Sequence, residues 1–208
     1  MALNIISAFW FVSILFVITP GVDWAYVISA GLNGRVVVPA VTGLLCGHLI
    51  TTIIVAAGVG TIITHYPVAI LMITIVGAIY LLWIGFNLLI HPPVPQAEQA
   101  NREKSWKQWL SKGLCVSGLN PKVFLLLLAL LPQFTDPHSL WAISTQIMFL
   151  GLIHLFSCGI VYLAVGFGAQ TILKTRPQAA QLISRFSGCS LILIGFSLIV
   201  EQLTHGFI

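Results

Sequence analysis

Six long apolar stretches with few charged side chains constrain this chain more than any other feature of its sequence. They cover residues 3–28, 37–63, 68–90, 113–131, 140–173 and 180–203. A helix needs about 20 mostly apolar residues to cross the hydrocarbon core of a bilayer. Charged residues make up 7% of the chain, whereas soluble domains carry about 25%. The sequence therefore predicts an all-α, polytopic membrane protein with six transmembrane helices.

The basic residues indicate how these spans are oriented. Lys and Arg occur in or beside the first, third and fifth loops, and they are missing from the second and fourth loops and from both termini. Loops rich in Lys and Arg lie on the cytoplasmic side of a membrane, so six spans place both termini outside. The net charge of +4 reflects this topology, and no nucleic-acid partner is expected from it.

The two halves of the chain share sequence features that predict an inverted repeat of three spans plus three. The third span contains "IGFNLLI" at 84–90, and the sixth contains "IGFSLIV" at 194–200. The second and fifth spans can be aligned on a histidine, and the first and fourth spans each contain a proline. Because each half has an odd number of spans, the second half must be inverted in the membrane.

The predicted organisation is a single transmembrane domain with repeat halves at 1–90 and 113–208 and a cytoplasmic connector at 91–112. The connector is proline-rich at its start and amphipathic at its end. There Trp106, Trp109 and Leu110 would share a face of a short helix at the lipid interface. We interpret the segment instead as an ordinary solvated connector with two interfacial anchors.

Prolines break the first and fourth spans. Pro20 and Pro121 lack the amide hydrogen that would bond four residues back, and such freed backbone groups are tolerated only inside protein or beside a watery cavity. Gly21 loosens the first break further, and Asn120 offers an amide beside the second. The prolines lie about 16 Å and about 12 Å from the cytoplasmic ends of their spans, so we expect the breaks to meet. A simple kink repaired by neighbouring helices is the alternative.

Asp23 directly follows the first break. A carboxylate inside a span costs about 2.5 to 3.5 kcal/mol on insertion scales, and such residues usually face a partner or a transport pathway. We therefore expect a functional role for Asp23. Two alternatives are a cap for the helix that starts there and a buried ion pair with Lys122, which follows the second break.

Two histidines, His48 and His154, lie about 17 Å and about 21 Å into their spans, and both positions are near the midplane. Each could serve as an interhelical hydrogen-bonding group, as a haem ligand, or, together with Asp23, as a ligand for a divalent cation. Gly43 and Gly47 form a GxxxG pattern before His48 and predict close helix packing.

The four cysteines argue against a metal site, because they are scattered singly and read as small core residues. They are Cys46, Cys115, Cys158 and Cys189. The sequence shows no plausible pairing of a nucleophile with a base, so it gives no indication of an enzyme.

The chain resembles the LysE/RhtB superfamily of bacterial amino-acid exporters along nearly its whole length. Four segments carry the resemblance: "TPGVDWAYVISAGLNGR" at 19–35, "GLLCGHLI" at 43–50, "GAIYLLWIGFNLL" at 77–89 and "GLNPKVFLLLLALLPQF" at 118–134. The first and last of these are the most specific. Many members read proline-glycine-proline at the first break, where this chain has Val22.

The resemblance implies a secondary transporter of the bacterial cytoplasmic (inner) membrane that exports amino acids such as homoserine, threonine or leucine. It also implies proton antiport, a homodimer and no cofactor. Carried over by position, the two signatures contain Pro20, Gly21, Asp23, Asn120, Pro121, Lys122, Pro132, Gln133 and Phe134.

A mechanism follows from combining the residues with the resemblance. An amino acid carries an ammonium and a carboxylate at close range, so its site needs paired opposite charges or dipoles. Asp23 is expected to hold the ammonium in one state and a proton in the other. The helix start after Pro121, with Asn120 and Lys122, is expected to receive the carboxylate. Rocking of one half against the other would then alternate the exposure of the site.

Overall fold

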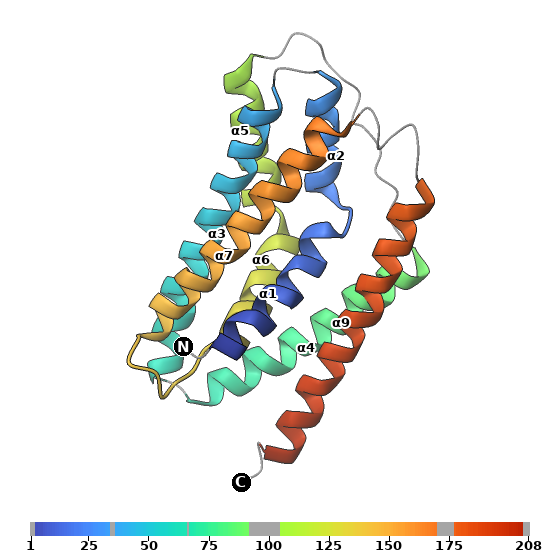
Figure 1. The fold of residues 1–208 in the computed structure, drawn as a ribbon. Coiled ribbons are helices and arrows are strands. Elements are labelled where there is room, and N and C mark those ends of the chain that lie inside the picture. Colours follow the sequence, from blue (N-terminus) through green and yellow to red (C-terminus); the bar gives the residue numbers. More distant parts are fainter. Residues whose placement is uncertain (1–2, 34–35, 66, 92–104, 170–176, 206–208) are drawn as a thin grey trace.

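In the computed structural model of the protein, every regular element is a helix over the described residues, which are 3–33, 36–65, 67–91, 105–169 and 177–205 (Figure 1). The helices in chain order are α1 (Leu3–Ile18), α2 (Val22–Leu32), α3 (Val37–His65), α4 (Pro67–Ile90), α5 (Trp106–Gly118), α6 (Pro121–Leu130), the short 3-10 helix η1 (Leu131–Phe134), α7 (Ile143–Phe167) and α9 (Pro177–His205). The predicted all-α class is thereby confirmed for these residues.

Two of the predicted spans are bent pairs of helices. The axes of α1 and α2 differ by 57°, and the axes of Trp106–Gly118 and Val123–Phe134 differ by 52°. The same kind of backbone hydrogen bond closes both breaks. The amide of Thr19 donates to the carbonyl of Phe16 at 3.2 Å, and the amide of Asn120 donates to the carbonyl of Ser117 at 3.2 Å. In each case the residue before the proline takes up the carbonyl that the proline leaves free.

Side chains complete the repair of the first break. The Thr19 hydroxyl donates to the carbonyl of Leu15 at 2.6 Å, and the Trp24 indole donates to the carbonyl of Val17 at 2.9 Å. Gly21, with φ −161° and ψ −161°, is the extended residue that precedes α2. The break is therefore a defined corner whose free carbonyls have found partners within a few residues.

Helices α3 and α5 pack closely because glycines remove the side chains between them. A methyl group at Gly43 would collide with the carbonyl oxygen of Leu110, and one at Gly113 would lie 2.7 Å from the carbonyl oxygen of Ala40. At Gly47 the nearest atom would be the amide nitrogen of Gly118, at 2.5 Å. The close packing predicted for the GxxxG pattern is confirmed.

This contact contradicts the prediction for residues 106–112, which the sequence analysis interprets as part of a solvated connector with two interfacial anchors. They are instead the first turns of α5, which continues without interruption to Gly118. Trp109 is buried, and its carbonyl accepts a hydrogen bond from the hydroxyl of Tyr26. The glycines of α3 let α5 approach along its length, so Trp109 packs in the protein interior and is not an interfacial anchor. Residues 92–104 of the predicted connector lie outside the described part of the chain.

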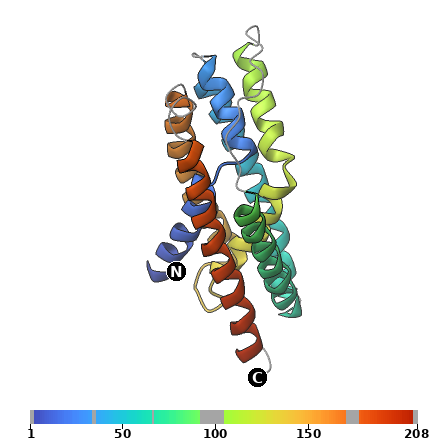
Figure 2. The ribbon, with the colours of Figure 1, turned by 90° about the vertical axis from the view of Figure 1, so that its right-hand side faces the viewer.

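Helices α4 and α9 run side by side in both views (Figures 1 and 2). A methyl group on Gly85 of α4 would lie 2.8 Å from the carbonyl oxygen of Gly188, and one on Gly195 of α9 would lie 2.9 Å from that of Ala78. Helices α1 and α6 lie between this pair and the group formed by α2, α3, α5 and α7 (Figure 1). Leu126 of α6 packs with Leu81 of α4 and joins it to the centre.

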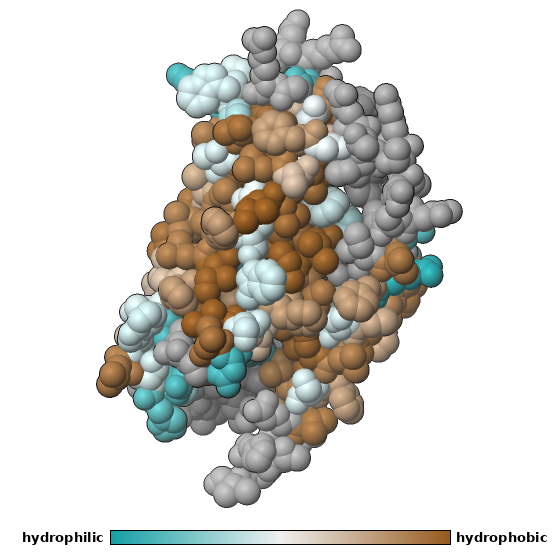
Figure 3. Space-filling model, in the orientation of Figure 1, coloured by the Kyte–Doolittle hydropathy of each residue, from teal (hydrophilic) through white to brown (hydrophobic). Residues whose placement is uncertain are grey.

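The outer surface is apolar over a broad area (Figure 3). Large exposed side chains include Ile50, Ile54, Leu152, Phe156 and Ile160, an arrangement that water would disfavour and lipid accepts. Two helical segments, Val37–Gly58 and Ile143–Phe167, are long and apolar enough to cross a membrane, and the two bent pairs raise the number to four among the described residues. Shorter apolar helical segments occur at Ile75–Ile90 in α4 and Gly188–Val200 in α9.

Candidate functional site

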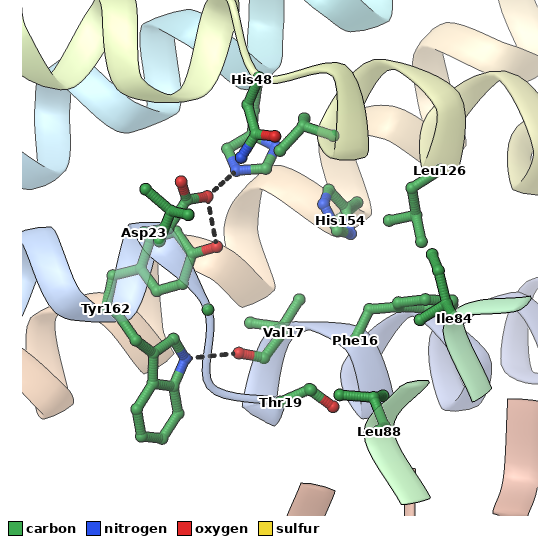
Figure 4. A pocket seen from close by; sticks show the side chains of 15 residues that line it. Phe16, Val17, Thr19, Asp23, His48, Ile84, Leu88, Leu126, His154 and Tyr162 are labelled. Carbon is green, nitrogen blue, oxygen red and sulfur yellow. Dashed lines mark hydrogen bonds and ion pairs between the residues drawn. The ribbon is translucent and has the colours of Figure 1, made fainter. Parts of the chain in front are cut away.

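A cavity of about 70 Å³ lies at the corner between α1 and α2. Its walls also come from α3, α4, α6 and α7. One side is polar and holds Asp23, His48, His154 and Tyr162, which point toward one another in Figure 4. Phe16, Ile84, Leu88 and Leu126 form an apolar side across from Asp23 (Figure 4), and Val17 and Val123 also line the cavity. The cavity therefore offers a charged end and a hydrocarbon end to any molecule that enters it.

Asp23 lies in the first turn of α2, where the positive end of the helix stabilises a carboxylate. Its Oδ2 atom is 3.0 Å from His48 Nε2 and accepts a hydrogen bond from the Tyr162 hydroxyl at 3.0 Å. Its Oδ1 atom is buried and has no hydrogen-bond partner within the described part of the chain. The contacts of Oδ2 thus fix the position of the carboxylate, whereas Oδ1 is left without a hydrogen-bond partner among the described residues.

His48 and His154 meet edge to face, with their ring centroids 5.3 Å apart. The hydroxyl of Ser13 on α1 is 2.7 Å from His154 Nδ1, and Cys158 Sγ, one turn further along α7, is 3.4 Å from His154 Nε2. His48 Nδ1 is buried without a partner among the described residues. The two histidines are therefore held by neighbours from α1, α2 and α7.

The structure brings together most of the residues singled out from the sequence. Gly21 from the first break and Asn120 from the second line the same cavity as Asp23 and the two histidines. Pro20 is buried at the first break. Helix α6 starts at Pro121, and the side chains of Pro121 and Lys122 lie outside the described ones, as does the predicted ion pair between Lys122 and Asp23.

Gln133 does not line this cavity. Its amide would be 2.9 Å from a methyl group on Gly77 of α4, and neither polar atom of its side chain has a partner in the described residues. Gln133 is placed there by η1, which turns the chain at the end of the second bent pair.

The sequence analysis did not predict three residues that contact Asp23 or His154. Tyr162 holds Asp23, and Ser13 and Cys158 contact His154. His154, Cys158 and Tyr162 follow one another at intervals of four residues, which places them along one side of a helix. That spacing was the available signal for Cys158 and Tyr162.

The site centres on the buried carboxylate of Asp23, which His48 and Tyr162 hold in place. The two histidine rings contact each other directly beside a cavity of about 70 Å³, which is too small for a porphyrin and argues against the haem alternative. Cys158 is a buried core residue, as predicted, but Cys115 and Cys189 are exposed, so the predicted core position is wrong for these two. The contact of Cys158 with His154 places a sulfur atom beside the histidines, which the sequence analysis did not predict.

Comparisons with known proteins agree with this picture. Residues 14–202 match the family model described as LysE type translocator. A leucine efflux protein of Klebsiella pneumoniae is 26% identical over 89% of both chains, and one of an Enterobacter species is 27% identical over 87% of both. An uncharacterized membrane protein of Vibrio cholerae is 30% identical over 66% of this chain and 68% of its own.

No solved structure matches the chain. The family model, in contrast, covers nearly the whole sequence, including both breaks, both histidines and Tyr162. The protein therefore belongs to the LysE type translocator family, and it is a multi-pass membrane transporter rather than an enzyme.

Proposed function

We propose that the protein exports aliphatic amino acids across the bacterial inner membrane in exchange for protons. The observation that carries this proposal is the buried Asp23 carboxylate, which faces a cavity at a helix break with one oxygen unpartnered among the described residues. The leucine efflux proteins to which the chain is similar favour an aliphatic amino acid as substrate.

Asp23 is proposed to bind the substrate ammonium and a proton in alternation. His48 and Tyr162 both contact Oδ2. Oδ1 has no hydrogen-bond partner among the described residues. An ammonium or a proton satisfies that oxygen, whereas an empty, charged carboxylate in an apolar interior is costly. The two ligands therefore exclude each other, which is the requirement for exchange.

The substrate carboxylate is proposed to lie at the start of the helices that follow the breaks. The first amides of a helix have no partner within that helix, and they favour negative charge. Gly21 before α2 and Asn120 before α6 both line the cavity. Asn120, Pro121 and Lys122 would thus form the carboxylate side of the site, and Asp23 the ammonium side.

The side chain of the substrate is proposed to extend toward Ile84, Leu88 and Leu126. These residues form the apolar wall across from Asp23 (Figure 4). A cavity of 70 Å³ holds on the order of five water molecules, so a leucine-sized substrate requires the walls to move apart. Helices α4 and α6, which supply this wall, would then open as part of the transport cycle.

Six spans in an inverted 3+3 repeat are proposed as the architecture behind this movement. Aligning the two prolines relates the bond from Thr19 to Phe16 with that from Asn120 to Ser117, and the two bonds have equal lengths. Aligning the two IGF motifs relates the contact of Gly85 with Gly188 to that of Gly195 with Ala78. Corresponding bonds in corresponding places support two copies of one folding unit. The homodimer implied by the resemblance remains a prediction.

The proposal is tested by counterflow in proteoliposomes with a panel of labelled amino acids. The wild-type protein should exchange leucine or a related aliphatic amino acid, and an imposed pH gradient should drive its net movement. Asp23→Asn should abolish both activities while the protein still inserts, because the amide keeps the size of the side chain but cannot carry the charge. Asp136→Asn is the matched control, since Asp136 lies in the loop before α7 and does not line the cavity.

If the wild-type protein exchanges none of the amino acids in the panel, the proposed substrate class is ruled out. Normal exchange by the Asp23→Asn variant would rule out the proposed role of Asp23.

A further inference from the structure

His48, His154 and Cys158 form a cluster whose chemistry amino-acid transport does not require. One ring nitrogen of each histidine and Cys158 Sγ lie within 4.8 Å of one another, and all three residues are buried. We propose that this cluster is a binding site for a thiophilic transition-metal ion of the Zn²⁺ class, and that such an ion inhibits export.

The separations are close to those of a tetrahedral metal site. Zn²⁺ binds imidazole nitrogen at about 2.0 Å and thiolate sulfur at about 2.3 Å, so neighbouring ligand atoms are roughly 3.5 Å apart. Cys158 Sγ and His154 Nε2 are already 3.4 Å apart. They are four residues apart on α7, so they lie one turn apart on the same side of the helix. His48 on α3 therefore needs to move only slightly toward them.

One ring nitrogen of each histidine is engaged as it is in metal sites. A metal-bound histidine generally uses its second ring nitrogen to contact a carboxylate or another polar group, which fixes the ring. Here His48 Nε2 contacts Asp23 Oδ2, and His154 Nδ1 contacts Ser13 Oγ. The other nitrogen of His48, Nδ1, is buried and has no hydrogen-bond partner in the described part of the chain. A metal ion would supply the partner that this nitrogen lacks.

The ligand set selects the class of ion. Two imidazoles and one thiolate suit Zn²⁺, Cd²⁺ and Co²⁺, whereas Mg²⁺ and Ca²⁺ prefer oxygen ligands. Three protein ligands leave one position open, as in catalytic zinc sites. Both histidines line the cavity, so an ion can enter from there, and water from the cavity can occupy the open position. Binding converts the Cys158 thiol to a thiolate and releases its proton to water.

Inhibition follows from where the ligands lie. The ion would join α3 to α7 beside Asp23, and so tie one predicted half of the transporter to the other. It would also hold a positive charge next to the carboxylate that is proposed to bind the substrate ammonium. The inhibitory effect rests on the proposed function, but the binding of the metal does not.

Binding is tested on the purified full chain in detergent by titration with Co²⁺, whose absorption spectrum reports thiolate ligation and tetrahedral geometry. The wild-type protein should show both signatures. Cys158→Ser should lose the thiolate band and bind at least tenfold more weakly. The matched control replaces Cys46, Cys115 and Cys189 by serine together and should keep the wild-type spectrum.

A variant of an outer contact provides a second, independent comparison. Ser13→Ala leaves all three ligands in place and should weaken Co²⁺ binding by about 10- to 100-fold. Equal Co²⁺ binding by the wild type and Cys158→Ser, or loss of the thiolate band in the triple variant, would overturn the proposed site.

Inhibition is tested by adding Zn²⁺ to leucine counterflow in proteoliposomes. Zn²⁺ should inhibit the wild type and the triple variant, whereas Cys158→Ser should require at least tenfold more Zn²⁺ for the same fractional loss of its own uninhibited rate. If the wild type exchanges no amino acid at all, the proposed function fails, and the Co²⁺ titration still decides the metal site. Unchanged leucine exchange by a wild-type protein that has bound Zn²⁺ would overturn the inhibitory role.

Discussion

At the scale of single residues, the central feature is a carboxylate whose two oxygens differ. Asp23 Oδ2 is held by His48 and Tyr162, whereas Oδ1 has no partner within the described residues. A buried charge is stable only when it is paired or hydrogen-bonded. Two donors on Oδ2 fix the position of the carboxylate without neutralising its other oxygen, and Oδ1 is the atom that we propose takes the exchangeable cation.

Tyr162 provides the first residue-scale prediction. Tyr162→Phe keeps the ring beside His48 and removes the hydroxyl that donates to Asp23. A hydrogen bond to a charged group contributes about 1.5 to 3 kcal/mol, so the transport efficiency for leucine should fall roughly 10- to 100-fold. Initial rates of counterflow over a range of leucine concentrations measure this effect.

Tyr80→Phe is the matched control for this variant. Tyr80 lies on α4 and does not line the cavity, so its variant should transport at the wild-type rate. Unchanged transport efficiency in Tyr162→Phe would show that the contact with Asp23 has no part in substrate binding.

The sequence reveals some of these residues and hides others. Asp23, His48 and His154 stand out because a polar side chain in an apolar span has to be compensated. Tyr162 and Ser13 do not stand out, because hydroxyl-bearing residues are ordinary in transmembrane helices. Their roles depend on which residue of another helix lies opposite, and that is decided by packing.

At the scale of the helix, glycines determine which helices touch. The carbonyl oxygen of Leu110 on α5 occupies the space that a side chain at Gly43 would need. Helix backbones approach this closely in membranes only where small residues line the contact. The GxxxG pattern is visible in the sequence, but its partner helix is not, and this is why residues 106–112 were predicted to belong to a solvated connector.

A pair of glycine variants tests this contact. Gly43→Ala places a methyl group against rigid backbone and should lower the free energy of unfolding by about 1 to 3 kcal/mol. Thermal unfolding of the purified protein in detergent should show the change as a lower midpoint.

Gly58→Ala, on the same helix, is the control, because nothing lies within 4 Å of a methyl group there. It should be neutral or slightly stabilising, since alanine favours a helix over glycine by up to about 1 kcal/mol. Equal midpoints for Gly43→Ala and the wild type would contradict the close packing of α5 on α3.

At the scale of the whole molecule, the chain builds one site from two broken helices. Each break follows from a proline that the sequence shows plainly. Their meeting could be expected from depth alone, but the walls of the cavity could not. Ile84 and Leu88 of α4 and Leu126 of α6 are ordinary apolar residues in the sequence, and only the arrangement of the helices turns them into the apolar side of the cavity.

The orientation of the molecule is a prediction that reporter fusions can test. Basic residues occur in or beside the predicted first, third and fifth loops, and such loops stay in the cytoplasm. Alkaline phosphatase, which folds only outside the cytoplasm, should therefore be active when fused after Ile208. The same enzyme fused within the predicted connector at 91–112 should be inactive. The reverse pattern of activities would show that the protein has the opposite orientation.

Proton movement driven by substrate is the most direct test of the proposal that Asp23 binds the substrate ammonium and a proton in alternation. Proteoliposomes that contain a pH-sensitive dye and the wild-type protein should change their internal pH when a leucine gradient is imposed, because protons move opposite to leucine. Asp23→Asn should show neither leucine flux nor a pH change, and Asp136→Asn should behave as the wild type. Leucine movement without proton movement in the wild type, or wild-type coupling in the Asp23→Asn variant, would contradict the assignment of Asp23 as the shared site for the ammonium and the proton.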